Sequence, residues 1–516
     1  MSTSSLIDFK SNKNVYSALE TAARHFGEKP FAFFSRDKNQ LSYTQLFEGA
    51  EGYASFLASQ QINFGSRATV YFEKSREFLC VYFALLKLGV TIHTIDINSN
   101  LKDELAAVTL LKSNVFLTNQ KTLKRASSEL KPILGLIRDV PEYDQIENGD
   151  FIPVPTAILE SSHPAVCVFT SGTTGIPKGI VSSHGNLLAA ANFVRLSHEI
   201  IESDIAVNII PMSSINGQVT TILGPLTVGS SVVFYQDMFS TFGILSCIEK
   251  YRATWFSGIP THYSIMVRIQ ANPSDFDLSA LKFVRSASAP LPVSILKAFE
   301  EHYRIPIINT LGLSEMTGQV FSNPRNSVNR KINSVGRPIG NQAKIVDSEG
   351  NQLGPGEEGE LIVTGDNLML GYCDDPDSTR IAVRNGWLYT GDIAYYDRDN
   401  FFYIVGRKKD IVIVGGQNVS LKEVDDIVYG CPDVIKTASI GATETNSPHG
   451  ETIISFVVKK RLSDLTEDKI RKHCAKSLSK HKIPRKVFFV DSLPEGGTGK
   501  ILRSRVKQLY EQLGIP

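Results

Sequence analysis

No apolar run in this sequence is long enough to cross a membrane, and no two cysteines lie close together. A bilayer core requires roughly 20 apolar residues, whereas the best candidate, residues 78–86, ends at Lys87. The 6 cysteines are widely spaced, with no C-x-x-C pair and no histidine at the spacing of a zinc site. These absences exclude a membrane-spanning chain and a disulfide scaffold, and they favour reduced thiols in the cytosol.

The sequence also lacks an excess of either charge. It has 54 Lys+Arg and 53 Asp+Glu over 516 residues, for a formal net charge of +1. A dedicated nucleic-acid binder needs many clustered basic residues, so that class is excluded. The first ten residues have neither the basic flank nor the apolar stretch of a signal peptide, and the last three match no sorting signal. We therefore expect a cytoplasmic protein with no nucleic-acid partner.

Hydrophobic residues make up 42% of the chain, which is enough to bury a substantial core. Short β-branched runs, such as 165–169, 206–210, 231–235 and 306–309, alternate with longer helical stretches. One helix is expected over residues 15–26, where apolar side chains recur on one face. This alternation predicts an α/β fold.

The sequence pattern changes near Lys344, where short expected strands and tight turns replace the alternation of strands and helices. Beyond it we expect helices at 421–429, 469–479 and 504–513, and strands at 453–458 and 487–490. We predict a large N-terminal α/β domain of several subdomains over residues 1–409. A small, mobile α+β domain is predicted over residues 410–516.

A literal G-x-G-x-x-G string occurs at residues 354–359. A dinucleotide site requires this string between a strand and a helix, with amides free to meet a pyrophosphate. Here Pro355, Glu357 and Glu358 occupy the loop and a strand is expected to follow it. Acidic side chains repel phosphate, so we interpret the string as a turn.

The segment FTSGTTGIPKG at residues 169–179 is a stronger candidate for anion binding. It follows an apolar strand and combines glycines, hydroxyl residues and Lys178. Glycines allow close backbone approach, hydroxyls and amides donate hydrogen bonds, and lysine adds a point charge. It is not a Walker loop, because Pro177 stands where that pattern needs glycine. On chemistry alone, a phosphate cradle and an ordinary polar loop are equally compatible with it.

Five ordered motifs together resemble the adenylate-forming (ANL) superfamily, which includes acyl- and aryl-CoA synthetases, carrier-protein-loading adenylation domains and luciferases. The first is the segment 169–179. NTLGLSE at 309–315 is similar to the adenine-binding motif, and LYTGD at 388–392 to the ribose-binding loop. GRKKD contains Arg407 at the spacing of the second ribose ligand, and GGTGK ends in Lys500.

The resemblance implies that a carboxylic acid attacks ATP to give an acyl-adenylate, which is then transferred to the thiol of coenzyme A. It implies ATP, Mg²⁺ and coenzyme A as cofactors, Lys500 and Glu315 as catalytic residues, and Glu315 as the metal ligand. The nucleotide-binding residues that it implies are Thr170, Ser171, Gly172, Thr173, Thr174, Gly175, Lys178, Ser288, Ala289, Pro290, Asn309, Thr310, Leu311, Gly312, Ser314, Asp392, Arg407 and Lys500.

The GRKKD segment lies between two apolar runs, 402–405 and 411–414. By turn chemistry alone it is a charged hairpin turn. In the family this segment is the hinge of the C-terminal domain, and Lys409 matches the hinge position. Rotation about it would withdraw Lys500 and bring residues 415–420 towards the acyl-adenylate.

Two positions depart from the family pattern. Leu311 replaces the tyrosine that stacks on adenine, so weaker ATP binding is expected. Ser214 replaces a histidine at the mouth of the acid pocket, for which Ser214, Asn216 and Gly217 are the candidate residues. No carboxylate lies between residues 211 and 218, where relatives that activate amino acids place an aspartate, and this disfavours α-amino acids.

The acceptor thiol stays open between coenzyme A and the arm of an acyl or peptidyl carrier protein. The basic stretch 472–486 is typical of a solvated helix face, but it would also suit the phosphate of coenzyme A or the acidic helix of a carrier. A catalytically idle binding protein is disfavoured, because Lys500, Asp392, Arg407 and Glu315 are all present.

Overall fold

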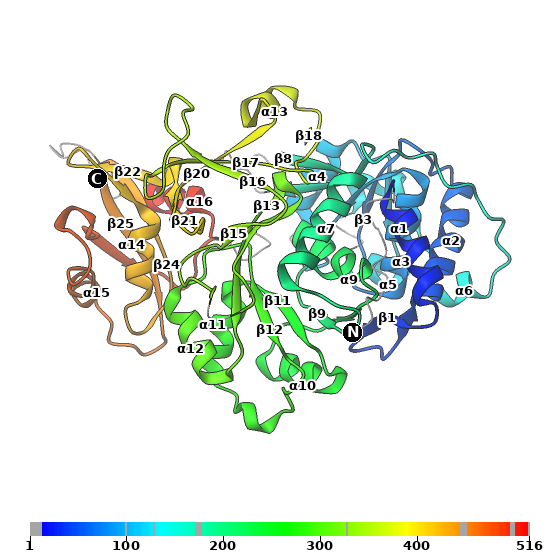
Figure 1. Cartoon of the computed structure of the whole chain (residues 1–516), viewed down its shortest axis with the longest axis horizontal. Helices are drawn as coiled ribbons and strands as arrows, with labels where there is room; N and C mark the ends of the chain where they lie inside the picture. The colour runs from blue at the N-terminus through cyan, green and yellow to red at the C-terminus, as the bar shows by residue number, and fades with distance from the viewer. Residues whose placement is uncertain are drawn as a thin grey trace.

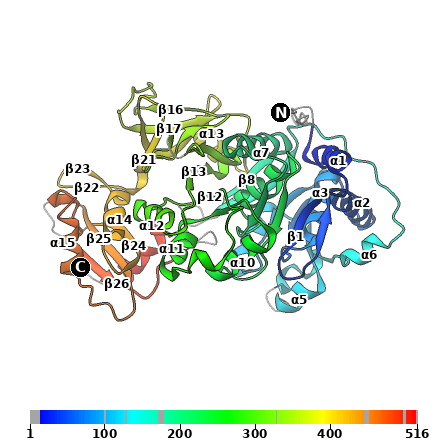
Figure 2. The ribbon, with the colours of Figure 1, turned by 60° about the horizontal axis from the view of Figure 1, so that its bottom comes forward.

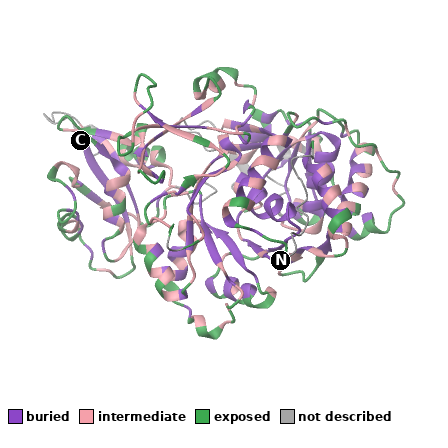
Figure 3. Cartoon of the chain, in the orientation of Figure 1, coloured by how far each residue is buried: buried purple, intermediate pink, exposed green. Residues whose placement is uncertain are grey.

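The computed structural model describes residues 13–98, 101–126, 130–170, 178–326, 329–443, 451–495 and 501–513. The chain runs from α1 to α3 at one end of the molecule to α14, α15 and β24 to β26 at the other (Figures 1 and 2). Strands of the central sheets are the most deeply buried parts (Figure 3).

The first large sheet has the order β15-β14-β13-β12-β11-β9-β10-β1-β2. The strands from β13 to β1 are parallel to one another, and the outer strands pair antiparallel. Strands such as SVVF in β10 are buried on both faces, which is typical of parallel strands covered by helices. The strands are β1 (Pro30–Phe34), β2 (Gln40–Ser42), β9 (Ile205–Asn208), β10 (Ser231–Phe234), β11 (Trp255–Gly258), β12 (Phe283–Ser286), β13 (Ile307–Leu313), β14 (Gly318–Ser322) and β15 (Arg337–Pro338).

The second large sheet has the order β18-β8-β7-β4-β3-β5-β6. Its strands from β7 to β6 are parallel, and β8 pairs antiparallel with both β7 and β18. The strands are β3 (Arg67–Val70), β4 (Thr91–Thr94), β5 (Val115–Thr118), β6 (Ile137–Asp139), β7 (Pro164–Thr170), β8 (Lys178–Ser183) and β18 (Gly371–Tyr372).

Helices α1 (Val15–Phe26), α2 (Tyr43–Ser59), α3 (Arg76–Leu88) and α7 (His184–His198) contribute to one apolar core together with strands of both large sheets. Asn14 caps the start of helix α1, where its side chain accepts a hydrogen bond from the Ser17 amide in a capping box. The opposite face of the first sheet packs against α10 (Thr241–Tyr251), α11 (Pro260–Ile269) and α12 (Val293–Tyr303). The remaining helices are α4 (Leu101–Leu111), α5 (Gln120–Ala126), α6 (Tyr143–Glu147), α8 (Ile215–Gln218), α9 (Gly224–Leu226), α13 (Pro376–Ala382), α14 (Leu421–Tyr429), α15 (Glu467–Cys474) and α16 (Arg503–Gln512).

A third sheet follows in the sequence, built from β16 (Gln342–Val346), β17 (Gly359–Thr364), β19 (Val383–Arg384), β20 (Trp387–Tyr396) and β21 (Phe402–Arg407). The string at 354–359 forms the turn before β17, as expected. There the amide of Gly354 donates to Glu357 Oε2 at 2.6 Å, and Gly356 has a φ of 87°. The acidic side chain thus occupies the position at which an anion would meet the loop amides.

The interpretation of GRKKD as a hairpin turn is wrong. Strand β21 pairs with β20, whereas β22 (Ile411–Val414) pairs with β23 (Gln417–Ser420) in a separate two-stranded sheet. A short 3₁₀ turn, Lys408–Asp410, is the only link in sequence between these two sheets. The apolar runs on either side of GRKKD therefore belong to different packing units.

The last part of the chain forms a sheet of β24 (Val434–Thr443), β25 (Glu451–Lys459) and β26 (Lys486–Phe489), which packs with α14, α15 and α16. The helix expected at 469–479 is displaced towards the N-terminus. It begins after Thr466, whose hydroxyl accepts from the Lys469 amide, and ends at Cys474. Glu467 and Asp468 occupy its first turn, where acidic side chains are favourable.

Within the described ranges, no helix is both long and apolar enough to span a membrane.

Candidate active site

The carboxyl ends of parallel strands β9, β11, β12 and β13 meet at one edge of the first sheet. Ligands of open α/β sheets bind at this edge. The register places Ser286 opposite Asn309, and Thr310 Oγ1 donates to the carbonyl oxygen of Ser286 at 2.9 Å. The two segments implied to border adenine, 288–290 and 309–314, are therefore neighbours.

The adenine-bordering residues differ in exposure. Ser288 and Pro290 are exposed and Ala289 is half-buried. Leu311 is half-buried and packs against the apolar cluster of the third sheet, opposite Phe321. The contact of Leu311 with adenine stays a prediction.

Gly312 and Ser314 lie at the end of β13, where the chain makes a close backbone approach. A Cβ on Gly312 would lie 2.7 Å from the carbonyl oxygen of Gly318, so only glycine fits without a shift. Asn309 uses its side-chain amide to donate to the carbonyl oxygen of Ser334 at 2.9 Å. These residues shape the backbone of the motif.

Glu315 and Lys178, far apart in sequence, contact the same side chain, Tyr372. The Tyr372 hydroxyl donates to Glu315 Oε1 at 3.1 Å, and Lys178 Nζ lies 4.9 Å from the ring centroid. Lys178 Nζ also donates to Ser378 Oγ at 2.9 Å, at the start of α13. Burial, together with the Glu315 carboxylate, raises the pKa of Tyr372, which therefore keeps its proton and orients Glu315.

The predicted phosphate-binding residues Ser171, Gly172, Thr173, Thr174 and Gly175 lie outside the described residues. Both flanks of the segment are defined: Thr170 ends β7, Lys178 begins β8, and the two face each other across the antiparallel pair. The segment therefore starts and ends beside the Lys178–Tyr372–Glu315 cluster.

Lys500 also lies outside the described residues, and again both flanks are defined. Glu495 and Ile501 form an antiparallel bridge, and the amide of Leu502 donates to the carbonyl oxygen of Pro494 at 2.9 Å. Glu495 is ion-paired with Lys436 on β24. The ends of the segment that carries Lys500 are thus fixed to the last sheet.

Asp392 and Arg407 face each other across β20 and β21. Arg407 Nε lies 2.6 Å from Asp392 Oδ1, and Asp392 is only 3% exposed. A carboxylate that accepts and a guanidinium that donates form a suitable pair for the two hydroxyls of a ribose. The structure brings the two implied ribose ligands together.

Lys409 is exposed within the turn Lys408–Asp410. On one side Lys408 Nζ lies 3.3 Å from Glu360 Oε2 of β17. On the other side Asp410 Oδ2 lies 3.5 Å from Arg503 Nε, and Arg503 Nη2 lies 2.5 Å from Asp425 Oδ2. The turn is thus attached to a different unit at each end.

A hydrogen-bond network joins α11 to the C-terminal elements. Ser264 Oγ lies 3.0 Å from the hydroxyl of Tyr429 on α14. Arg268 Nη2 donates to Ser264 Oγ at 2.7 Å and to the carbonyl oxygen of Ile435 at 3.4 Å. Residues 415–418, by contrast, are exposed to solvent.

The candidate acid-pocket residues cluster around the start of α8. Ser214 caps this helix: its Oγ accepts from the Gly217 amide at 3.1 Å and donates to the carbonyl oxygen of Pro211 at 3.0 Å. A Cβ on Gly217 would lie 2.3 Å from that same carbonyl oxygen. Asn216 Oδ1 accepts from Arg285 Nη1 at 2.8 Å. Arg285 is a buried residue of β12 that sequence reasoning missed, although a lone arginine within an apolar strand was a usable signal.

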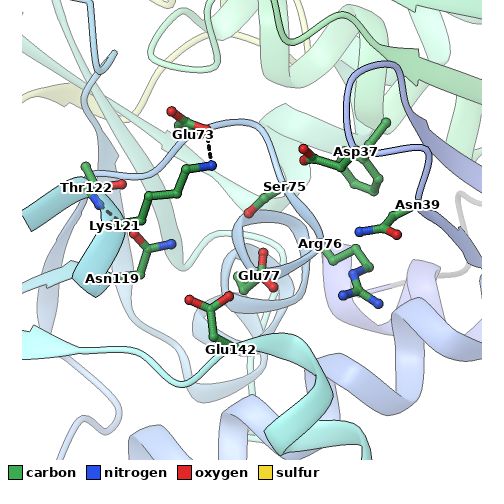
Figure 4. A pocket seen from close by; sticks show the side chains of 11 residues that line it. Asp37, Asn39, Glu73, Ser75, Arg76, Glu77, Asn119, Lys121, Thr122 and Glu142 are labelled. Atoms are coloured by element: carbon green, nitrogen blue, oxygen red, sulfur yellow. Dashed lines mark hydrogen bonds and ion pairs between the residues drawn. The ribbon is translucent and has the colours of Figure 1, made fainter.

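One cavity, of about 220 Å³, lies elsewhere, and none of the predicted site residues lines it (Figure 4). Its charged side chains are largely paired, as with Lys121 Nζ and Glu73 Oε2 at 3.1 Å. It is lined by Phe34, Asp37, Asn39, Glu73, Ser75, Arg76, Glu77, Asn119, Lys121, Thr122 and Glu142.

The structure brings Lys178 and Glu315 to Tyr372 and pairs Asp392 with Arg407, and the comparisons with known proteins agree with the resemblance that these residues carry. The AMP-binding enzyme family matches residues 19–373, and the AMP-binding enzyme C-terminal domain matches residues 423–500. The chain belongs to the AMP-binding enzyme family. The prediction of an adenylate-forming enzyme is confirmed.

This AMP-binding enzyme is 29% identical over 491 residues to the sulfoacetate–CoA ligase of Cupriavidus necator, which covers 94% of this chain and 95% of the relative. It is 29% identical over 504 residues to the oxalate–CoA ligase of Arabidopsis thaliana, with 95% and 98% covered. A solved structure of an anthranilate CoA ligase in complex with anthranoyl-AMP superposes with a TM-score of 0.87 at 24% identity, covering 96% of this chain and 97% of that one. The predicted fold class, a large α/β part and a smaller C-terminal part, is confirmed.

Proposed function

We propose that this AMP-binding enzyme is an ATP-dependent ligase that joins a carboxylic acid to coenzyme A, releasing AMP and pyrophosphate. The observation that carries the proposal is the convergence of Lys178 and Glu315 on Tyr372, where the phosphate-binding segment begins and ends. Two relatives named as CoA ligases over nearly the whole chain support coenzyme A as the acceptor.

In the first step a carboxylate oxygen attacks the α-phosphorus of ATP, and the bond to pyrophosphate breaks. A carboxylate has no good leaving group of its own, so this activation precedes thioester formation. Asp392 and Arg407 hold the ribose, Lys178 offsets charge on the phosphates, and Lys500 stabilises charge as the new bond forms.

Glu315 suits a magnesium ion that accompanies the phosphates. Mg²⁺ is usually bound through one or two carboxylates together with phosphate oxygens and water. Glu315 is half-buried and oriented by Tyr372, and within the described ranges no cluster of three or more His, Cys, Asp or Glu side chains suggests another site. The bound ion would screen the negative charge of the phosphates.

For the second step we propose that residues 410–516 turn as a domain on residues 1–409, with Lys409 as the hinge. The separation of the β20–β21 and β22–β23 sheets at this turn supports this division. The turn would withdraw Lys500 and bring residues 415–418, exposed in this arrangement, to the acyl-adenylate. The thiol sulfur then attacks the acyl carbon, and AMP leaves.

Loading of a carrier protein is the second candidate. Its acidic helix would need a basic surface, and the stretch 472–486 is less cationic than its sequence suggests. Three of its lysines pair with acids: Lys472 with Asp468 at 2.7 Å, Lys482 with Glu423 at 2.7 Å, and Lys486 with Glu467 at 3.1 Å. This pairing weakens the case for the carrier.

The test is AMP release measured across a panel of acids, with coenzyme A and holo-carrier protein as alternative acceptors. Saturable, acid-dependent turnover with coenzyme A is expected. Turnover with the carrier alone would favour the second candidate, and absence of acid-dependent AMP with both acceptors would overturn the proposal.

A further inference from the structure

Arg285 is a buried cation without an anionic partner among the residues that the structure describes. It lies on β12, between Val284 and Ser286, and is 1% exposed. Its hydrogen bonds go to neutral oxygens: Nε and Nη2 to Gln319 Oε1 at 3.2 Å, and Nη1 to Asn216 Oδ1 at 2.8 Å and Ser257 Oγ at 2.9 Å. No carboxylate in the described part of the chain forms an ion pair with it.

Burial of such a charge is unfavourable unless an anion accompanies it. Burial lowers the pKa of Arg285 to about 10, so the side chain keeps its charge at neutral pH. His198, which shares Gln319 Oε1, stays neutral, because burial and then the Arg285 charge lower its pKa to about 3. The region therefore carries one uncompensated positive charge.

Two unused hydrogen-bond donors lie at this charge. A guanidinium has five N–H donors, and one N–H on Nη2 has no partner among the described residues. The amide nitrogen of Asn216, whose Oδ1 accepts from Arg285, is buried and likewise lacks a partner within that part of the chain. A group that only accepts hydrogen bonds and is negatively charged would satisfy both.

The position of this cluster relates it to the acid pocket. Asn216, which Arg285 contacts, is a candidate acid-pocket residue, and the strand that carries Arg285 pairs at its next residue with Asn309 of the adenine-binding motif. Arg285 is three residues before Ser288, at most roughly 10 Å along the chain. An acid that reaches Arg285 with one end, while its reacting carboxylate lies beside the nucleotide-binding segment at Ser288, must therefore be short.

We propose that Arg285 binds a second anionic group of the substrate, so that the acid activated is a small one bearing a carboxylate or sulfonate beside its reacting carboxylate. The inference rests on the proposed ligase function and assigns the substrate class of that site. The Asn216 amide nitrogen donates to the same group. Specificity arises because an acid without the second anion leaves the buried guanidinium uncompensated.

The first experiment compares kcat/KM for malonate and sulfoacetate with kcat/KM for propionate and butyrate. We expect the dianionic acids to be preferred at least about 100-fold, as for sites whose buried polar groups stay unpaired with the wrong substrate. Equal or better use of the monoanionic acids would overturn the proposal.

Two variants test the role of Arg285. Asn216→Asp is nearly isosteric and places a carboxylate 2.8 Å from Arg285 Nη1. This carboxylate of the protein itself would neutralise the Arg285 charge in place of the substrate anion. Arg285→Gln removes the charge. In both, the ratio of kcat/KM for malonate to that for propionate should fall at least about tenfold, and general damage to the enzyme cancels in this ratio. A ratio unchanged in both would show that Arg285 is purely structural.

Arg325→Gln is the matched control. Its guanidinium lies 5.2 Å from the Phe283 ring and donates to the carbonyl oxygen of His198, so it is a nearby cation that does not contact Asn216. The ratio should keep its wild-type value in this variant. A fall as large as that in Arg285→Gln would overturn the assignment to Arg285.

A binding measurement separates this proposal from the ligase function. If no acid in the panel yields AMP, the ligase proposal fails, yet malonate binding by isothermal titration calorimetry still tests Arg285. Binding to the wild-type enzyme that is lost in Asn216→Asp supports the anion site. Absence of malonate binding to the wild-type enzyme would overturn it.

Discussion

Tyr372 shows how a single residue links two motifs that lie far apart in the sequence. Its hydroxyl fixes one oxygen of Glu315, while its ring faces the ammonium of Lys178. A cation over an aromatic face gains about 0.5–1 kcal/mol at an accessible site. The carboxylate proposed to hold Mg²⁺ and the lysine proposed to hold phosphate are therefore positioned together.

Lys500 is the residue on which the first half-reaction should depend. Lys500→Ala should reduce adenylate formation by at least about 100-fold, because one preorganised donor of this kind contributes that much. A separately supplied acyl-adenylate should still be converted to thioester at nearly the wild-type rate. Pyrophosphate release and thioester formation, assayed apart, check this, and equal loss of both would contradict the assigned role.

Leu311 should limit affinity for ATP. Leu311→Tyr restores an aromatic ring beside adenine, and stacking contributes about 0.5–1.5 kcal/mol beyond buried area. The KM for ATP should therefore fall by about two- to tenfold, measured at saturating acid. Leu311→Met, of similar size, is the control and should leave that KM unchanged. An unchanged KM in Leu311→Tyr would mean that residue 311 does not touch adenine.

Cys373 should be the reactive thiol of the chain. It is half-buried, whereas the other cysteines are buried, and Arg67 Nη1 lies 3.9 Å from its Sγ. A hydrogen bond from Cys167, aided by the Arg67 charge, lowers the pKa of Cys373, so its thiolate forms at a lower pH than that of an ordinary cysteine.

Iodoacetamide labelling followed by mass spectrometry measures this directly. Labelling of Cys373 should rise with pH to a midpoint below the usual thiol pKa of about 8.5. Arg67→Ala should move the midpoint upwards. Preferential labelling of Cys80 or Cys247 would contradict the expectation.

Residues in continuous motifs were predictable, and residues that act through tertiary contact were not. Asp392 and Arg407 each stand in a recognisable string, and the structure pairs them. Tyr372 and Arg285 stand in no motif: their importance arises from partners on other elements, such as Glu315 and Asn216. Gln218, adjacent in sequence to the candidate acid-pocket residues, is buried, and its side-chain amide donates to Thr94 Oγ1 and to the carbonyl oxygen of Met212.

At the level of elements, the 3₁₀ turn Lys408–Asp410 is where the backbone should bend between the two half-reactions. Proline fixes φ near −65° and restricts the residue before it. Lys409→Pro should therefore slow thioester formation by at least about tenfold while adenylation stays within about twofold.

The control for this prediction is Lys408→Ala, which removes only the contact with Glu360. Both half-reactions should proceed normally in that variant. Rapid-quench measurement of adenylate and thioester gives the two rates. Normal thioester formation in Lys409→Pro would argue against a hinge at residue 409.

Elements with strong local signals were predicted closely. Helices α1 and α14 begin and end at the expected residues, because their apolar faces are periodic and α1 is capped. Helix α15 begins two residues before the expected start at 469, because Thr466 caps it and Glu467 and Asp468 form an acidic first turn. The hairpin interpretation paired β22 with β21, whereas β22 pairs with β23. Hydrophobic periodicity indicates that a segment is a strand but does not indicate which other strand it pairs with.

At the level of the whole molecule, residues 415–418, the segment proposed for the thioester step, are exposed to solvent. This exposure is expected of the arrangement proposed for adenylation, before the C-terminal part turns. The network of Arg268, Ser264 and Tyr429 maintains this arrangement. The α/β architecture could be predicted from composition and from the alternation of strands and helices. The contacts between α11 and the C-terminal elements could not, because no sequence pattern relates these distant segments.

Arg268→Ala should therefore slow adenylation at least about tenfold, because a hydrogen bond to a charged group contributes about 1.5–3 kcal/mol. Thioester formation from supplied acyl-adenylate should be unaffected, since that arrangement does not use the contact. Arg252→Ala, which removes a surface pair with Asp277, is the control and should change neither rate. Equal slowing of both steps would show that Arg268 supports the fold alone.

Arg503 ties the turn to the rest of the C-terminal part. It joins Asp410, the last residue of the turn, to Asp425 on α14, and it lies three residues after Lys500. In the proposed rotation, a twist of a few backbone bonds at 408–410 would therefore move the turn, α14 and the start of α16 together. A small change of angle at residue 409 would then produce a large displacement of the lysine proposed to act at the phosphate.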